Sequence, residues 1–175
     1  MPLRDEISRF DGRHVNVLED VLASHRATDA FLSNLVILAG DEEPNVQTSA
    51  TWLLKKLVES DVKLKKKHLI ALFDSVSELN HWLPKLHICQ MLEHLSIPAE
   101  SKRNLKWFLE QNLEDSNKFL RAWTYNGFFQ LAKQHREYFD YAMEQIDRGD
   151  LEEAKSIRAR IRAIRAEMRK LPREE

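Results

Sequence analysis

Glycine, proline and cysteine are scarce in this sequence. Its 175 residues contain 4 glycines and 5 prolines, too few for a turn-rich β-sandwich or for a nucleotide-binding fold built on glycine loops. The single cysteine excludes an intramolecular disulfide framework and a cysteine-rich zinc module, and it fits a reducing compartment. These scarcities favour an all-α chain.

A strong net charge and long apolar runs are also missing. The 27 basic and 28 acidic residues give a formal net charge of −1, so no global field draws the protein toward nucleic acid or a membrane. No apolar run has the length of a membrane span, and the N-terminal MPLRDEISRF has no signal-peptide core. We therefore expect a cytoplasmic protein that does not bind membranes.

Helical periodicity is the dominant pattern that is present. Apolar residues recur at spacings of three and four, and Pro44, Pro84 and Pro98 mark boundaries between helices. No linker or low-complexity stretch interrupts this pattern, and 43% of the residues are hydrophobic, which is enough for one core. Residues 1–175 are therefore predicted to form a single domain.

An internal repeat is visible in three segments. These are VQTSATWLLKKL (46–57), PKLHICQMLEHL (84–95) and LRAWTYNGFFQL (120–131). Their last leucines, Leu57, Leu95 and Leu131, recur at spacings of 38 and 36 residues, and we expect all three to be buried at equivalent positions. A pair of helices of this length cannot bury its apolar stripe alone, so the units are predicted to stack as an α-solenoid.

The segment DEEPNVQTSATWLLKKL resembles the HEAT-repeat family, in which a turn with aspartate and proline precedes a valine and an arginine of the second helix. The matching residues are Asp41, Pro44, Val46, Ala50 and Leu57. Gln47 stands at the arginine position, Asp115 and Arg121 recur in the third unit, and Lys85 keeps the positive charge in the middle unit. The resemblance covers residues 27–136.

The resemblance implies a short right-handed α-α superhelix of three to four helix pairs, with residues 137–175 as a divergent terminal pair. It also implies a polar ladder between repeats, formed by Asp41, Lys85, Asp115 and Arg121. A catalytic role for these residues is less favoured, because their spacing recurs where an enzyme would have one active site. The motif specifies a fold and not an activity.

No motif indicates catalysis or metal binding. His81, His87 and His94 could share one side of a helix, but the sequence has no HExxH and no cysteine pair. Cys89 lies in an apolar stretch and is interpreted as a core residue. We expect no cofactor, no metal and no enzymatic activity.

Gly127 lies inside a predicted helix, where glycine costs ~1 kcal/mol relative to alanine, so we expect it to mark close packing.

The outward side of the second helices is the candidate binding surface, because second helices line the concave face in solenoids of the family. The candidate residues are Trp52, Lys55, Gln90, Tyr125, Asn126 and Phe129. Exposed aromatic side chains are typical anchors of protein interfaces. The alternative is that these aromatics pack beneath a terminal helix or a neighbouring repeat. The predicted function is a non-enzymatic scaffold that binds another protein or a peptide.

The last helix carries an apolar seam flanked by basic residues. The candidate contacts for an anionic partner are Arg158, Arg162, Arg165 and Arg169. One interpretation is a capping helix with solvated arginines, and the other is a contact for nucleic acid or an acidic protein. The alternative function is therefore nucleic-acid binding, as in HEAT-like DNA glycosylases for alkylated bases, with Asp115, Arg121 and Trp123 at the damaged nucleotide. The absence of consistently basic second-helix faces counts against it.

Overall fold

The computed structural model describes residues 1–152 and 154–171. All regular structure in these ranges is helical, which confirms the all-α prediction. The α-helices are α1 (Leu3–Ile7), α2 (Asn16–Ser24), α3 (Asp29–Ala39), α4 (Pro44–Glu59), α5 (Lys66–Asp74), α6 (Trp82–Met91), α7 (Lys102–Leu113), α8 (Lys118–Gln134), α9 (Phe139–Gly149) and α10 (Lys155–Met168). Short 3-10 turns are η1 (Ser75–Glu78), η2 (Leu92–His94) and η3 (Arg136–Tyr138).

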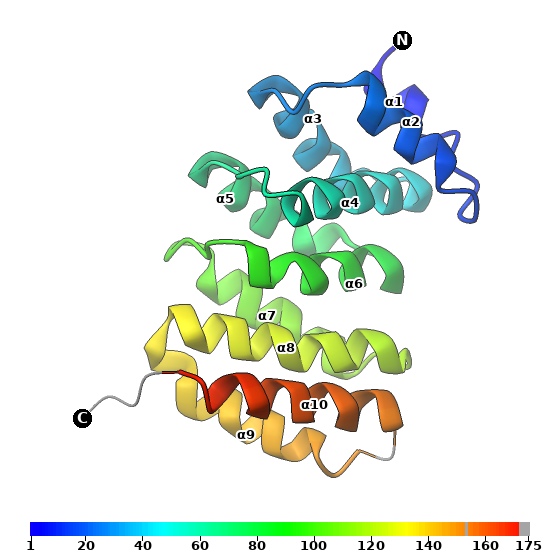
Figure 1. Ribbon diagram of the computed structural model, residues 1–175. Coiled ribbons are helices and arrows are strands. Elements are labelled where there is room, and N and C mark those ends of the chain that lie inside the picture. Colours follow the sequence, from blue (N-terminus) through cyan, green and yellow to red (C-terminus); the bar gives the residue numbers. More distant parts are fainter. Residues whose placement is uncertain (153, 172–175) are drawn as a thin grey trace.

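The helices from α3 onward form two layers (Figure 1). One layer contains α3, α5, α7 and α9. The other contains α4, α6, α8 and α10, each in contact with the next, and we call it the second-helix layer. The first helices α1 and α2 lie against α4 at the N-terminal end. The helices of the second-helix layer thus stack in the order of the sequence.

Local capping interactions fix where several of these helices begin. The Thr28 side chain accepts a hydrogen bond from the backbone N–H of Phe31, and the Asn117 side chain accepts bonds from Phe119 and Leu120 at the start of α8. Pro44 is the first residue of α4, where its missing N–H is tolerated. These residue types are the start signals that the sequence displays.

The spacing of Leu69, Leu72, Phe73 and Val76 predicts a helix over residues 62–79. The observed helix is shorter. Asp61 adopts a positive φ of 65°, and the backbone N–H groups of Asp61 and Val62 bond to the oxygens of Val58 and Leu57. This pattern of bonds is a Schellman motif, which closes α4 and turns the chain away from a helical path. The next helix therefore begins only at Lys66.

The core consists of two clusters of buried side chains. The larger one extends from α1 to α9 and contains Phe73, Phe108 and Phe128, each at most 1% exposed. The smaller one lies between α8, α9 and α10. Leu95 and Leu131 are buried as predicted, whereas Leu57 is only partly buried against the larger cluster.

Gly127 lies at a close approach between α8 and its neighbours. A Cβ atom at this position would come within 2.5 Å of Leu109 Cδ2 and 3.2 Å of Leu92 Cδ1. Both leucines are fully buried, so they have little space into which they could move. The prediction of close packing at Gly127 is confirmed.

Candidate functional site

The aromatic residues predicted to form an exposed ridge on α8 are buried. Tyr125, Asn126 and Phe129 are 4%, 3% and 1% exposed, so the prediction that they offer a surface to a partner is wrong. The isoleucines of α10, Ile157 and Ile161 among them, pack with Tyr125 and Phe129 in the smaller core cluster. The terminal helix covers these aromatics, which was the alternative left open by the sequence.

The other three predicted residues remain at the surface. Trp52, Lys55 and Gln90 are partly buried. On α4, the Thr51 hydroxyl meets His87 Nδ1 at 3.0 Å on the side of α6, and Ser49 donates to the backbone of α1 on the other side. Successive residues are rotated by about 100° around the helix axis. Trp52 therefore lies between the side of Ser49 and the side of Thr51, and it points away from α3.

The second-helix layer contains a second partly buried tryptophan, one helical turn before Asn126, the residue that the repeat aligns with Trp52. Trp123 of α8 is partly buried, and the guanidinium carbon of Arg160 from α10 lies 3.6 Å from its ring centroid. The Lys56 ammonium lies 5.6 Å from the Trp52 ring in a looser version of the same contact. Cation–π contacts at the surface stabilise by ~0.5–1 kcal/mol, and they hold the rings in place.

The charge of Glu93, in the short turn η2 that follows α6, acts on this group. Burial lowers the pKa of Arg160, and the negative charge of Glu93 opposes that shift, which places the Glu93 carboxylate within electrostatic range of Arg160. We call the surface formed by Trp52, Lys56, Gln90, Glu93, Trp123 and Arg160 the free face of the second-helix layer. The sequence favours Trp123 only for the alternative nucleic-acid site and not for the protein-binding surface, although it lies one helical turn before the predicted Asn126.

The predicted polar ladder is not continuous. Asp41 and Asp115 each accept a hydrogen bond from the backbone N–H two residues later, which stabilises their own turns. Asp41 also forms a two-bond ion pair with Arg4 of α1, which lowers the pKa of Asp41. Arg121 does reach the next helix pair, at Glu152, whereas Lys85 makes no hydrogen bond or ion pair with the described part of the chain. The prediction of one repeated ladder is therefore wrong.

A different residue provides a bond between units near the N-terminal end. Gln47, at the position where the family has arginine, donates through Nε2 to the backbone oxygen of Glu78 at 2.8 Å. Its side chain is 1% exposed, so the bond is shielded from water. Gln47 and Arg121 thus occupy equivalent repeat positions and both bond to the following unit.

The four arginines predicted to contact an anionic partner differ in their surroundings. Arg165 forms ion pairs with Asp147 of α9 and with Asp150 just after α9, and both raise the pKa of its guanidinium. Arg158 is exposed but also engaged in an interaction of its own. Arg162 and Arg169 are exposed on α10 and at its end. Arg165 is thus already neutralised within the protein, and the basic strip is interrupted at its centre.

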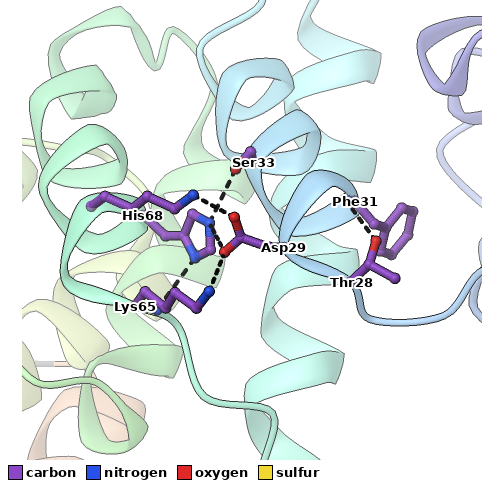
Figure 2. A network of polar contacts seen from close by, with 7 residues as sticks. Thr28, Asp29, Phe31, Ser33, Lys65 and His68 are labelled. Carbon is purple, nitrogen blue, oxygen red and sulfur yellow. Dashed lines mark hydrogen bonds and ion pairs between the residues drawn. The ribbon is translucent and has the colours of Figure 1, made fainter.

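A serine, a histidine and an aspartate meet between α3 and α5. His68 Nε2 lies 3.1 Å from Ser33 Oγ and 3.4 Å from Asp29 Oδ1, while Lys65 and Lys67 both form ion pairs with Asp29 (Figure 2). The backbone N–H of Lys65 donates to His68 Nδ1. The proton of a neutral imidazole is therefore on Nε2 and faces Ser33, so His68 cannot accept a proton from that hydroxyl.

This cluster is therefore a structural contact between two helix pairs. Burial lowers the pKa of His68, and the two lysines lower the pKa of Asp29 to about 2. The histidine is 2% exposed, so no substrate has access to its ring.

Cys89 and the histidines give no other reactive group. The Cys89 thiol is buried, and burial raises its pKa to about 12, so it stays protonated and unreactive at neutral pH. Burial lowers the pKa of His87 to about 3. Within residues 1–152 and 154–171, no group of three or more His, Cys, Asp or Glu side chains has a geometry that could hold a metal ion. None of the helices in these ranges has both the length and the apolar character required to cross a bilayer.

Comparisons of the chain with models of protein families, with curated proteins and with solved structures found no match.

Proposed function

We propose that this protein is a non-enzymatic scaffold that binds another protein or a peptide, and that its fold is a short right-handed superhelix of HEAT-like helix pairs. The repeat of two-helix units and the order in which they stack support the superhelix. Binding would take place on the free face of the second-helix layer.

The observation that carries this function is the pair of partly exposed tryptophans on that face. Trp52 and Trp123 come from two different units of the stack and each lies beside a cation. Tryptophan is enriched among the residues that dominate binding energy at protein interfaces. The cations Lys56 and Arg160 favour a partner with acidic side chains next to apolar ones.

The test uses two tryptophan substitutions and a matched control. Proteins captured by the wild type from its native cell extract would first be identified by mass spectrometry. Trp52→Ala and Trp123→Ala should each weaken capture by ~30-fold, since truncation of a true anchor costs about 2 kcal/mol or more. Trp107→Ala is the control, because Trp107 is 47% exposed on α7 in the other layer.

Circular dichroism of each variant would establish that it is folded. Loss of capture in the two free-face variants, with retention in Trp107→Ala, supports the proposal. Equal capture by all three folded variants would place binding elsewhere.

Nucleic-acid binding is the alternative function. The exposed Arg162 and Arg169 favour it, whereas the ion pairs of Arg165 with Asp147 and Asp150 count against it. Affinity for duplex DNA that falls steeply with salt concentration would support this alternative. Absence of such binding at low salt would exclude it.

A further inference from the structure

A pocket of about 680 Å³ opens where two turns of the stack meet. Its lining residues are Ser116, Lys118, Arg121, Tyr125, Arg148, Leu151, Glu152 and Ala154. They come from the start of α8, the end of α9 and the connection to α10, which lie at the same end of the stack, at the right in Figure 1. Three of these side chains are cationic and one is anionic, so the pocket has an excess of positive charge.

The guanidinium of Arg121 is held in one orientation. Its Nη1 donates to the backbone oxygens of Asp115 at 2.8 Å and Ser116 at 3.1 Å, both in the turn before α8. Its Nη2 points to Glu152, and the side chain is 18% exposed. Nη2 is therefore the part of this guanidinium that a ligand in the pocket could reach.

Tyr125 places a hydroxyl next to Arg121. Its Oη lies 3.4 Å from Glu152 Oε1. Burial, followed by the negative charge of Glu152, raises the pKa of Tyr125 to about 12. The hydroxyl therefore keeps its proton at neutral pH and is able to donate a hydrogen bond to an anion.

Arg148 approaches the pocket from α9. Its side chain is 64% exposed and pairs with Glu144, one helical turn earlier, at 2.5 Å. Exposed ion pairs of this kind contribute little to stability. Arg148 can consequently leave Glu144 and pair with an anion in the pocket, with little loss of stability.

Glu152 occupies the pocket but makes only long contacts there. Its two carboxylate oxygens lie 3.4 Å from Arg121 Nη2 and 3.4 Å from Tyr125 Oη, whereas charge-assisted hydrogen bonds measure about 2.5–2.9 Å. An external monoanion carries the same charge as Glu152. Glu152 has the advantage, because it is tethered to the site by the chain. A dianion would bring a second charge to the three cations and could displace Glu152.

We propose that Arg121, Tyr125 and Arg148 form a binding site for a phosphate monoester, whose phosphate group displaces Glu152. Phosphate monoesters carry about −1.5 to −2 charges near neutral pH, and the planar guanidinium matches the spacing of phosphate oxygens. The pocket is larger than a phosphate group, and the 84% exposed Leu151 provides an apolar contact for the organic part of the ester. The site shares no residue with the free face of the second-helix layer and does not depend on the protein-binding role.

Titrations of the full-length, 15N-labelled protein followed by NMR would test the site. The ligands are a capped phosphoserine tripeptide, glycerol 3-phosphate and acetate, at pH 7.5 and constant ionic strength. Both phosphate esters should give saturable shifts at Arg121, Tyr125 and Arg148, and acetate should give none. The ester that binds more tightly identifies the carrier, a modified polypeptide or a small molecule such as a lipid headgroup.

Three substitutions separate a built site from general attraction of anions. Arg148→Gln removes an exposed charged contact and should weaken binding of the better ester by about tenfold. Glu152→Gln removes the internal competitor and should strengthen binding several-fold. Arg103→Gln removes one positive charge, as Arg148→Gln does, but at an exposed position at the N-terminal end of α7. This substitution should leave the affinity unchanged.

The proposal is overturned if neither ester gives saturable shifts in the wild type. It is also overturned if Arg148→Gln and Arg103→Gln have the same affinity, or if Glu152→Gln fails to bind more tightly. The substitution at Arg148 is the main test because that side chain is exposed, and a loss of folding is therefore not expected.

Discussion

Acidification should destabilise this protein through one buried histidine. His87 of α6 is 5% exposed, and its Nδ1 lies 3.0 Å from the Thr51 hydroxyl of α4. Burial is the largest cause that lowers its pKa, to about 3, and the charges of Lys55 and Lys56 add to the effect. The imidazole is therefore neutral in the folded protein throughout the range from pH 7 to pH 5.

The size of the effect follows from proton linkage. An unfolded histidine has a pKa of about 6.5, so below this pH the unfolded chain binds a proton that the folded protein does not bind. Stability is therefore lost as the pH falls from 7 toward the folded pKa. Between pH 7 and pH 5 the loss from this one group is about 2 kcal/mol, which corresponds to a decrease in Tm of about 4–8 °C.

Urea unfolding at pH 7 and pH 5, followed by circular dichroism, measures this loss. His87→Gln keeps a polar side chain near Thr51 but cannot titrate, so the variant should lose about 2 kcal/mol less than the wild type over the same interval. His94→Gln is the control, because it removes an exposed imidazole just after α6. Equal losses in the wild type and in His87→Gln would refute the reasoning.

Three further predictions concern packing and chain geometry. Gly127→Leu should lower Tm by more than 4 °C, because the added side chain meets buried Leu109 and Leu92; an unchanged thermal melt would contradict the close packing. Asp61→Gly should stabilise by about 0.5–1 kcal/mol in urea unfolding, since residue 61 has a positive φ, and a loss of stability would show that the Asp61 side chain contributes something else. Cys89 should react with a thiol reagent only at the rate of global unfolding, because it is buried; rapid labelling of the native protein would disprove this.

Helix positions were largely readable from the sequence because their signals are local. Thr28 and Asn117 are start signals whose hydrogen bonds extend only two or three residues. The stripe of apolar residues at helical spacing identified Leu95 and Leu131 as buried. The connection after α4 was not readable in this way, because Asp61 takes a conformation that glycine normally provides.

The sequence by itself thus determined that the chain is helical, where most helices begin, and which leucines recur in the core. Only the tertiary structure decided which remaining faces are exposed. Helix α8 contacts α6, α7, α9 and α10, so Tyr125 and Phe129 are covered by a helix that lies some 30 residues later in the chain. A periodic pattern records that a side chain is apolar or aromatic, but not which distant segment covers it. The same reason applies to the pocket at Arg121, because its lining residues belong to three segments that meet only after the helix pairs have stacked.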